Sequence, residues 1–350
     1  MKASYLKYTL QFKQPGGTSR GVLTQKDTYF IVLEDTGQWG IGETGLFRGL
    51  SYDDRPDYEA MLALACKDLE TDLEGALFKY QEYPSIVFGM EQAVRSFQSP
   101  DPFCLFPDAP FLNGDPIPIN GLIWMGDIGF MKAQIADRLK QGFTCLKLKI
   151  GALNFEEELR MLSEIRSEFG PADLEIRVDA NGAFPAGEAL LRLKHLAALD
   201  LHSIEQPIAA GQPDAMAELC TGTPLPIALD EELIGCIPYE DKSRMLKAIR
   251  PQYIILKPSL VGGFSGSEEW IRLAEELRIG WWVTSALESN IGLNAIAQWT
   301  SSLDVHMPQG LGTGSLFTNN ISSPLEVAGG ALRYDFRASW DVQKIQSLCI

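Results

Sequence analysis

A parallel (β/α)₈-type barrel, preceded by a smaller α+β domain, is the fold that this sequence predicts. Two observations predict it. Beyond about residue 140, short apolar runs alternate with helical stretches, which is typical of successive βα units in a parallel sheet. The polar residues that end these runs also recur at a nearly constant step of 30, 26, 25, 27 and 28 residues: Lys149, Asp179, Glu205, Asp230, Lys257 and Ser285.

A doubly wound sheet is the alternative to the barrel, because it produces the same step. It gives no reason, however, for every strand to end in a charged or polar residue. In a barrel the carboxyl ends of all strands meet at one mouth, where active sites form. The polar strand ends therefore favour the barrel.

The N-terminal third of the chain has a different pattern. Residues 1–53 alternate as strands do, with QPGGTSRG as a Gly-rich loop between the first two. From Tyr58 to Phe97 the periodicity is helical, and a Pro-rich stretch over 99–119 follows. We expect two domains: an α+β domain over residues 1–115, completed by the C-terminal residues 325–350, and the barrel over residues 116–324.

Composition narrows the classes of protein and of partner. The chain has 350 residues, of which 45% are hydrophobic and 22% charged, which excludes a disordered or fibrous protein. The formal net charge of -16 argues against nucleic acid and against an anionic membrane as partners. The opening stretch MKASYLKYTLQFK lacks an apolar core, so we expect a cytoplasmic protein. The oligomeric state is left open.

Thiol, zinc and histidine chemistry are all disfavoured. The cysteines are scattered, with no C-x-x-C pair and no cluster at zinc spacing. The chain has three histidines, too few to favour a Ser-His-Asp triad. We expect most of the six cysteines to be small buried residues, and His195 and His202 to serve in packing or at the surface.

The stretch CLKLKIG, from Cys145 to Gly151, raises the question of where its lysines point. Side chains alternate faces along a strand, so Lys147 and Lys149 share one face. An antiparallel strand could expose them to water. In a parallel barrel the outer face packs against helices, so the lysines must point inward. An inward lysine near a metal ion or a second lysine should have a lowered pKa, which suits a general base.

The acids at the strand ends indicate a metal site. Asp179, Glu205 and Asp230 end three consecutive strands, so their carboxylates should meet at one side of the mouth. Like charges held that close need a cation. An all-oxygen ligand set favours Mg²⁺, with Mn²⁺ as a possible substitute. Each acid could instead be a helix N-cap, although three in phase make capping the weaker explanation.

Lys257 completes the arrangement. It ends the strand four places after the one that carries Lys149, which is the opposite wall of an eight-stranded barrel. A metal ion with an amine on each side is suited to removing a proton next to a carboxylate, since the ion stabilises the enediolate charge and a lysine takes the proton. We therefore expect a small anionic carboxylate as substrate.

These segments resemble the enolase superfamily. KLKIG, RVDANGAF, IEQP, ALDEEL and LKPSLVGG match, in order, the subgroup with two catalytic lysines, which includes muconate-lactonising enzymes, dipeptide epimerases and o-succinylbenzoate synthases. SALESNIGLNAIAQW and PQGLGTGSLF are most similar to the o-succinylbenzoate synthases of menaquinone biosynthesis. The resemblance implies a modified (β/α)₇β barrel and an N-terminal capping domain that closes over the mouth with the loops around Gly16–Leu23 and Leu46–Leu50.

The resemblance also implies residue roles in a metal-dependent hydro-lyase. Lys149 would be the base that removes the α-proton and then protonates the departing hydroxyl, and Lys257 would stabilise the enediolate from the opposite side. Asp179, Glu205 and Asp230 would bind Mg²⁺. Ser285 and Gly312 are weaker candidates for the succinyl carboxylate, and Ser285 could equally be a simple strand-end hydroxyl. The full set of candidates for substrate binding or support is Lys147, Asn181, Glu231, Ser285 and Gly312.

Other functions remain open at this point. A Schiff-base aldolase uses one inward lysine but does not need three facing carboxylates. A binding module that has lost catalysis would be expected to lose some of the polar strand ends, and none is lost. Within the superfamily, an N-acylamino acid racemase or a dipeptide epimerase is the main alternative, although the eighth-strand region lacks the Asp-x-Asp pair by which the epimerases hold an ammonium group.

Overall fold

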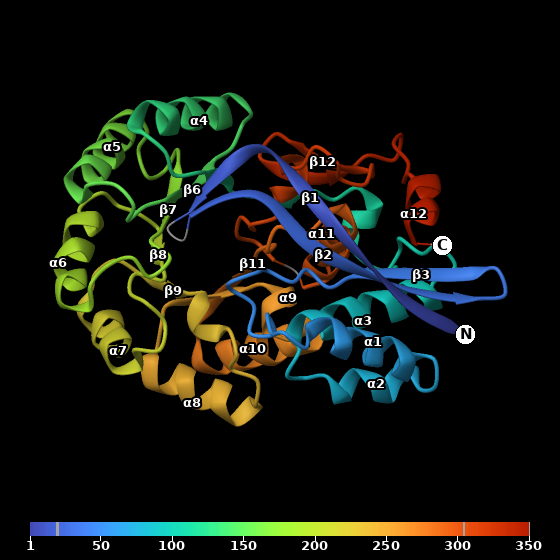
Figure 1. Cartoon of the computed structure of the whole chain (residues 1–350). Helices are drawn as coiled ribbons and strands as arrows, with labels where there is room; N and C mark the ends of the chain where they lie inside the picture. Colours follow the sequence, from blue (N-terminus) through green and yellow to red (C-terminus); the bar gives the residue numbers. More distant parts are fainter. Residues whose placement is uncertain (19–20, 304, 350) are drawn as a thin grey trace.

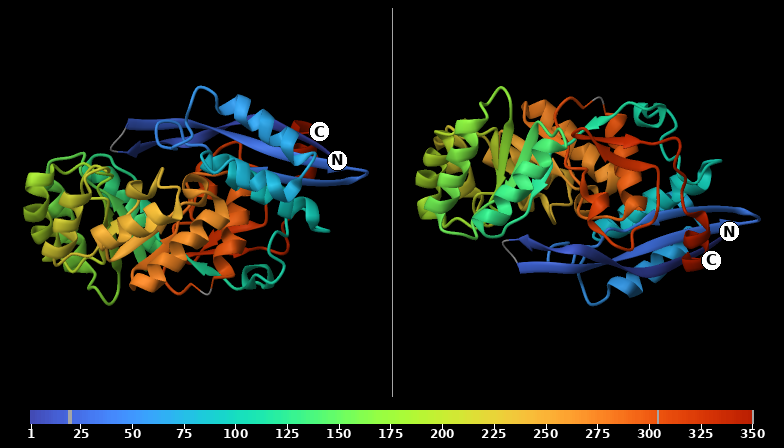
Figure 2. Two further views of the ribbon diagram at one scale, coloured as in Figure 1. Left: turned by 90° about the horizontal axis from the view of Figure 1, so that it is seen from below. Right: turned by 90° about the horizontal axis from the view of Figure 1, so that it is seen from above.

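The computed structural model describes residues 1–18, 21–303 and 305–349. A ring of strands surrounded by helices forms one part of the molecule, and a long twisted hairpin crosses one side of this ring (Figure 1). The two views in Figure 2 show the hairpin and its helices lying along the barrel rather than apart from it. The predicted α/β barrel with an N-terminal α+β domain is confirmed.

The N-terminal domain is an antiparallel sheet covered by helices. The sheet has the order β1-β2-β3, and residues such as Tyr29, Ile31 and Leu33 of β2 are fully buried in its core. These alternate side chains share one face of the strand, which packs against the helices. The elements are β1 (Lys2–Thr18), β2 (Gly21–Asp35), β3 (Gln38–Glu43), α1 (Tyr58–Leu69), α2 (Leu73–Lys79) and α3 (Pro84–Gln98).

The expected Gly-rich loop is wrong over much of its length. Residues 14–17 belong to β1, where Gly16 pairs with Leu23 and Gly17 with Val22. The register shifts between Gln11 and Gly16, so a β-bulge absorbs the extra residues that the sequence pattern suggested were a loop. Part of the expected loop, residues 19–20, lies outside the described residues. The expected strand region also ends early, since β3 ends at Glu43 and the next residues form a loop.

Parallel strands form the barrel wall. In the described part of the chain the sheet runs in the order β11-β10-β9-β8-β7-β6-β5. The strands are β5 (Gly121–Ile123), β6 (Cys145–Lys149), β7 (Glu175–Asp179), β8 (Ser203–Glu205), β9 (Ile227–Leu229), β10 (Tyr253–Leu256) and β11 (Gly280–Val283).

A short segment closes the ring between β11 and β5. Gln309 forms a parallel bridge with Ile119, and Gly310 forms one with Thr284. The amide of Gly310 donates to the carbonyl of Val283 at 2.8 Å on one side. The amide of Asn120 donates to the carbonyl of Gln309 at 2.9 Å on the other. This segment takes the place of an eighth strand.

Helices cover the outside of the barrel. Leu146 and Leu148 of β6 are fully buried in the core beneath these helices, which leaves the inner face of the strand to its lysines. The helices and 3₁₀ turns of this part are η1 (Pro110–Asn113), α4 (Ile128–Lys140), α5 (Phe155–Glu168), α6 (Ala186–Ala197), α7 (Pro213–Gly222), η2 (Glu231–Leu233), α8 (Tyr239–Ile249), α9 (Pro258–Val261), α10 (Gly263–Leu277), α11 (Asn290–Ser301) and η3 (Thr313–Leu316). None of the described helices combines the length and apolarity needed to cross a membrane.

The C-terminal residues divide between the two parts. β12 (Leu325–Ala328) pairs with β13 (Ala331–Tyr334), which in turn pairs with β4 (Ile117–Pro118), directly before the barrel. The last helix, α12 (Val342–Cys349), instead brings Ile345 into an apolar cluster with residues of β2 and β3. Assigning residues 325–350 to the N-terminal domain remains a proposal, supported by α12 rather than by the β12–β13 hairpin.

A buried carboxylate docks the N-terminal domain onto the barrel. Glu91 of α3 is 9% exposed and accepts hydrogen bonds from the amides of Phe264, at 2.5 Å, and Ser265, at 3.1 Å. These amides begin α10, where a negative charge is favoured.

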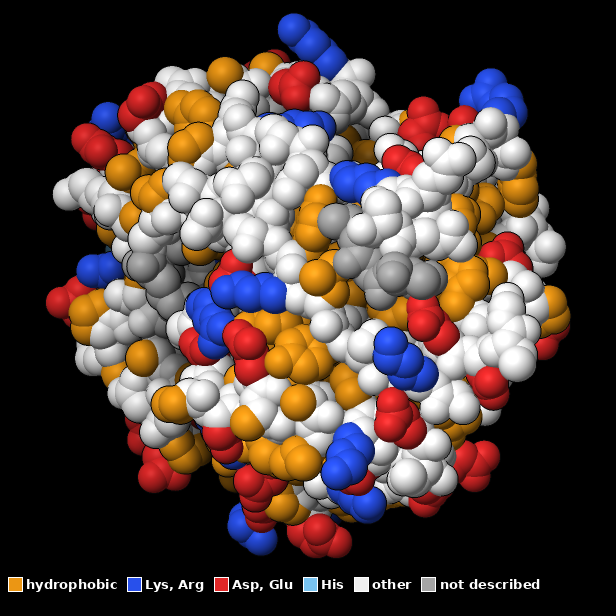
Figure 3. All heavy atoms as spheres, turned by 45° about the vertical axis from the view of Figure 1, so that its right-hand side comes forward, with side chains coloured by type: hydrophobic (Ala, Val, Ile, Leu, Met, Phe, Trp, Pro, Cys, Tyr) orange, Lys and Arg blue, Asp and Glu red, His pale blue; other side chains and the backbone are white. Residues whose placement is uncertain are grey.

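On the surface, acidic, basic and scattered hydrophobic side chains are interspersed on the face shown in Figure 3.

Candidate active site

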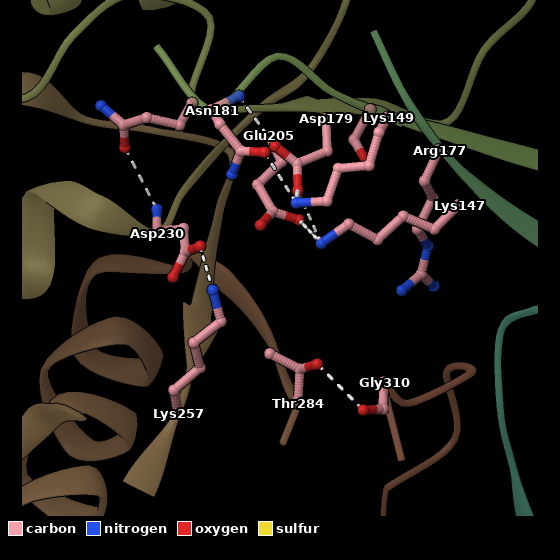
Figure 4. A network of polar contacts seen from close by, with 12 residues as sticks. Lys147, Lys149, Arg177, Asp179, Asn181, Glu205, Asp230, Lys257, Thr284 and Gly310 are labelled. Carbon is pink, nitrogen blue, oxygen red and sulfur yellow. Dashed lines mark hydrogen bonds and ion pairs between the residues drawn. The ribbon is translucent and has the colours of Figure 1, made fainter. Parts of the chain in front are cut away.

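The two lysines of β6 point into the barrel, as predicted. Lys147 and Lys149 both line the central cavity, and each side chain is 12% exposed. The cavity lies at the carboxyl ends of the strands and is also lined by Lys257, which follows β10. Figure 4 shows Lys147 and Lys149 reaching in from one side and Lys257 from the other.

The three predicted carboxylates meet at this mouth. Lys149, Asp179 and Glu205 are paired in register across β6, β7 and β8, so their side chains lie at one level. Asp230 follows β9 and is also buried, as are the other two acids. The structure therefore brings together all five strand-end residues that the sequence singled out for the metal and the chemistry.

Each carboxylate is engaged by a lysine. Lys149 Nζ lies 2.5 Å from Asp179 Oδ2, and Lys147 Nζ lies 2.9 Å from the same oxygen. Lys147 also pairs with Glu205, and Lys257 pairs with Asp230. The mouth thus balances three carboxylates with three ammonium groups in a buried setting, where unpaired charges are costly.

For Lys147 and Lys257 this balance reverses the expected lowering of the lysine pKa. Burial alone lowers the pKa of Lys147, but Asp179 and Glu205 outweigh it and raise the pKa above its usual value. Burial likewise lowers the pKa of Lys257, and Asp230 with Glu205 raises it more. Facing carboxylates decide the direction here, because they favour the charged ammonium.

The carboxylates respond unequally. Burial raises the pKa of Asp179, yet Lys147 and Lys149 together hold it well below its usual range. Glu205 has the opposite outcome, since burial and the neighbouring charge of Asp179 raise its pKa well above normal. Glu205 is therefore the acid with the greatest unmet need for positive charge.

The donor chemistry of the mouth fits a divalent cation. The ligand set is all oxygen, and Oε1 of the buried Glu205 has no hydrogen-bond partner among the described residues. In the ranges that the structure describes, no three His, Cys, Asp or Glu side chains are arranged to hold a metal ion. Lysine ammonium groups lie against the carboxylates instead, so a cation would replace these contacts.

Asn181 holds the proposed base in place. Its Oδ1 accepts a hydrogen bond from Lys149 Nζ at 2.7 Å, and its Nδ2 donates to Glu231 Oε1 at 3.0 Å. The backbone amide of Asn181 donates to Asp179 Oδ1 at 2.9 Å. Asn181 has φ of 43°, a strained value for a residue with a side chain. The structure thus places the predicted support residues Asn181 and Glu231 directly behind Lys149.

Sequence reasoning missed Gln206. This residue is fully buried with φ of 39°, and its side chain accepts from the amide of Asp230 and donates to the carbonyl of Ile208. It therefore fixes the backbone beside two carboxylates, Glu205 and Asp230. The motif IEQP contained the signal, but nothing local marks a glutamine as an organiser of its neighbouring strand.

The opposite side of the cavity is lined by neutral polar groups. Ser285 Oγ and Thr313 Oγ1 are 2.6 Å apart, and Thr284 Oγ1 donates to the carbonyl of Gly310 at 2.9 Å. Ser285 and Gly312 both line the cavity, as do Thr284 and Thr313, which the sequence analysis did not select. Hydroxyls and loop amides suit a second anionic group.

The N-terminal domain supplies apolar cover. Leu23 of β2 and Phe47 and Leu50 from the loop after β3 line the same cavity, together with Trp124. Gly16 lies against the Trp124 ring, since a Cβ there would be 3.1 Å from it. Both loops expected to close over the mouth therefore reach it in their described residues.

The histidines and cysteines examined by the sequence analysis lie away from the cavity lining. His195 packs near the ring of Phe155, and His202 lies 5.0 Å from the ring of Tyr253. Cys66, Cys145 and Cys220 are buried free thiols, as expected, whereas Cys104 and Cys236 are half-buried. The two histidines match their expected packing roles.

Comparison with known proteins identifies the family. A family model described as enolase C-terminal domain-like matches residues 131–342, more than half of the chain. The chain belongs to the enolase superfamily. Members of this superfamily typically depend on a divalent metal ion.

Individual relatives extend the match to both parts of this superfamily member. The o-succinylbenzoate synthase of Desulfotalea psychrophila is 48% identical, covering 95% of this chain and 98% of that protein. The crystal structure of MenC from D. psychrophila LSv54 aligns with a TM-score of 0.85 and 45% identity, over 95% of this chain and 99% of that one. The structure of the muconate lactonizing enzyme of Pseudomonas fluorescens in complex with muconolactone aligns with a TM-score of 0.79, over 99% of this chain and 98% of that one. Its sequence is 20% identical, so this likeness supports the fold alone.

Proposed function

We propose that this enolase superfamily member is an o-succinylbenzoate synthase, a carbon–oxygen lyase of menaquinone biosynthesis that acts in the cytoplasm. One observation carries the proposal: 48% identity to the D. psychrophila o-succinylbenzoate synthase extends over nearly the whole of both chains. The substrate is the succinyl-substituted hydroxycyclohexadiene carboxylate, and the products are o-succinylbenzoate and water.

Asp179, Glu205 and Asp230 are the proposed ligands of Mg²⁺, for which Mn²⁺ could substitute. The buried Glu205 with its unpartnered Oε1 supports this assignment. When bound, the cation would stabilise the negative charge that develops on the substrate carboxylate as the α-proton leaves. Its positive charge would also offset the carboxylate charges that raise the pKa of Lys147 and Lys257.

Lys149 is the proposed general base and acid. It takes the proton from the carbon beside the ring carboxylate, and the resulting ammonium returns a proton to the hydroxyl on the same face. The carbon–oxygen bond breaks, water leaves, and the ring becomes aromatic, so protons and electrons balance without a redox partner. The contact from Asn181 Oδ1 to Lys149 Nζ, 2.7 Å long, orients the amine for both transfers.

Lys257 supplies charge rather than a proton. It lines the cavity from the opposite wall, and the raised pKa that Asp230 and Glu205 give it against the effect of burial favours an ammonium at neutral pH. A cation over the ring face stabilises a developing negative charge. Lys147, which pairs with both Asp179 and Glu205, is proposed to support the ligands.

Ser285 and Gly312 remain the candidates for holding the succinyl carboxylate, with the adjacent Thr313 as an addition. Ser285 Oγ and Thr313 Oγ1 lie 2.6 Å apart at the cavity wall. Such a site would draw an anion into a protein whose overall charge is -16, because the local donors and lysines outweigh the distant acids.

Racemisation of N-acyl amino acids and epimerisation of dipeptides are the alternatives within the superfamily. The segment GLGTG stands where an Asp-x-Asp pair would hold a substrate ammonium. A Schiff-base aldolase is less compatible with the mouth, where ion pairs with carboxylates engage Lys149 and Lys257.

An assay of the purified protein with Mg²⁺ tests the proposal. The cyclohexadiene substrate is compared with a panel of N-acyl amino acids and dipeptides, and borohydride trapping checks for a Schiff base. We expect kcat/KM for dehydration to exceed every other value in the panel. A higher kcat/KM for an N-acyl amino acid would replace the proposal with a racemase.

A further inference from the structure

Three separate segments form the cover of the active-site cavity. Leu23 belongs to β2, Phe47 and Leu50 belong to the loop after β3, and residues 285–287 follow β11 of the barrel. Two of these segments come from the N-terminal domain and one from the barrel. Their relative positions decide whether the cavity is closed.

Lys26 lies where these three segments meet. It is the first fully buried residue of β2 after the exposed start of that strand, and its side chain is 6% exposed. Its Nζ donates to the carbonyl of Gly45 at 3.3 Å, at the beginning of the loop that carries Phe47. A buried ammonium is costly unless it is paired, so this position needs a reason.

Two buried carboxylates supply the compensating charge. Burial lowers the pKa of Lys26 below its usual value, and the negative charges of Glu288 in the barrel and Glu43 in β3 offset this lowering only in part. Glu288 is fully buried and accepts hydrogen bonds from the Ser259 hydroxyl and the Ala286 amide, each at 2.6 Å. The positive charge of Lys26 is therefore attracted by carboxylates from both domains.

Glu43 ties the same cluster to the start of α11. It is fully buried and accepts from the amides of Ser289 and Gly292, each at 2.9 Å, and from the Ser289 hydroxyl. These donors begin a helix, where a carboxylate is favoured. Glu43 thereby fixes β3 to the barrel immediately before the loop that covers the cavity.

At Gly45 the covering loop lies too close to the barrel to accommodate any residue with a side chain. Its φ is 69°, and a Cβ there would lie 2.8 Å from Ser259 Cβ and 3.0 Å from Glu288 Oε1. Ser259 follows the proposed catalytic Lys257 by two residues. The loop backbone is thus pressed against the segment that follows Lys257, and its Gly45 carbonyl accepts the hydrogen bond from Lys26.

We propose that Lys26 is a positioning residue that latches the cover of the active site closed. Its hydrogen bond to the Gly45 carbonyl of the covering loop, together with the attraction between its charge and the carboxylates of Glu288 in the barrel and Glu43 in β3, holds the three cover segments in one arrangement. Lys26 does not touch the reacting atoms. Its role for turnover rests on the proposed function, but the latch itself can be measured without substrate.

The test is Lys26→Met, which keeps the length of the side chain and removes its charge and its donors. Hydrogen exchange read by mass spectrometry follows peptides over residues 21–28 and 44–51. We expect both to exchange faster than in the wild type, with the barrel peptide over 145–150 unchanged. In the dehydration assay KM should rise about 10-fold or more while kcat changes much less, as for a misplaced binding element.

Lys242→Met is the matched control. Lys242 is another buried lysine, 2% exposed, whose Nζ donates to Glu269 at 2.8 Å and to the carbonyl of Gly266, all within the barrel. Its loss should lower stability without faster exchange in residues 44–51 and without the change in KM. Equal loosening of that peptide by both variants would show a general loss of stability and would overturn the latch.

Gly45→Ala is a second test of the latch, because it alters the covering loop and leaves Lys26 intact. Its methyl group must displace the loop from Ser259, so the same peptide should exchange faster and KM should rise. This variant decides the matter if Lys26→Met does not fold. Wild-type exchange and KM in either folded variant would contradict the proposal. A wild-type protein inactive on the cyclohexadiene would refute the proposed function and leave the exchange result standing.

Discussion

The mouth and the floor of the barrel use the same strands for opposite purposes. Two residues before Asp230, Lys257 and Thr284, the same inward faces carry Ala228, Ile255 and Trp282, which form a buried apolar cluster. The ends of these strands carry charged or polar side chains, whereas the level beneath them on β9, β10 and β11 is apolar.

Arg177 lies in the floor layer, in register with Lys147 of β6. It is 2% exposed, lies two residues before Asp179, and places its guanidinium 4.4 Å from the centre of the Trp282 ring. It also donates to the carbonyl of Pro308 at 2.9 Å, beside the segment that closes the barrel. The apolar packing of the floor therefore stabilises the barrel, whereas the converging charges at the mouth destabilise it and serve the chemistry.

Removal of divalent ions should have the largest effect at the mouth. On the proposed assignment of the three carboxylates as metal ligands, exhaustive chelation should abolish turnover, and added Mg²⁺ or Mn²⁺ should restore it. The measurement is dehydration rate against added ion. Full activity in chelated protein would remove the metal from the account.

Asp230→Asn should weaken metal binding while changing the shape of the site little. Losing a ligand should reduce affinity by more than the roughly 10- to 100-fold typical of a supporting residue. Because Asp230 pairs with Lys257, the metal-free variant should also be less stable, since it leaves a buried ammonium without its partner.

Calorimetric titration with Mn²⁺ measures this loss of affinity. Glu231→Gln is the comparison, since Glu231 accepts a hydrogen bond from Asn181. We expect a smaller loss for Glu231→Gln. The reverse order would move the ligand assignment to Glu231.

At the floor, Trp282→Ala should cost stability rather than chemistry. Trp282 is 2% exposed, and truncating a large buried aromatic typically costs about 3–5 kcal/mol. Trp281 on the same strand is half-buried on the outer side, so Trp281→Ala is the matched control and should cost less. Urea unfolding gives the stability and kcat the chemistry. Loss of turnover in a stable Trp282→Ala protein would erase the distinction between floor and mouth.

A smaller effect is expected in the N-terminal domain, at Asp53. Burial raises the pKa of Asp53 to about 6, although hydrogen bonds from Ser85 oppose the rise. The folded state then holds the proton more tightly than the unfolded state, so stability is lost as pH rises from about 4 to 6, by up to about 3 kcal/mol. Asp53→Asn should remove this loss. Parallel stability–pH curves for the two proteins would contradict the assignment.

The sequence was most informative where a period constrains side chains. Alternation in CLKLKIG required inward lysines once the strand was parallel, and the constant step brought Asp179, Glu205 and Asp230 to one mouth. Both predictions depend on geometry that every barrel strand shares, and the structure brings these residues together.

Features that depend on distant partners could not be predicted. Gln309 and Gly310 form too short a segment to show a strand period, and Lys26 is explained by Glu288, 262 residues away in the chain. The raised pKa of Lys147 could not be predicted for the same reason, because carboxylates from β7 and β8, which the local sequence does not contain, determine its direction.

The central claim is that one lysine of the mouth performs both proton transfers while the other supplies charge. Turnover of the cyclohexadiene by Lys149→Ala and Lys257→Arg, with circular dichroism confirming the fold of each, tests it most directly. We expect Lys149→Ala to lose at least about 10²- to 10⁴-fold in kcat and Lys257→Arg, which keeps a cation, to be impaired but measurable. A Lys149→Ala protein that dehydrates at nearly the wild-type rate would contradict the account.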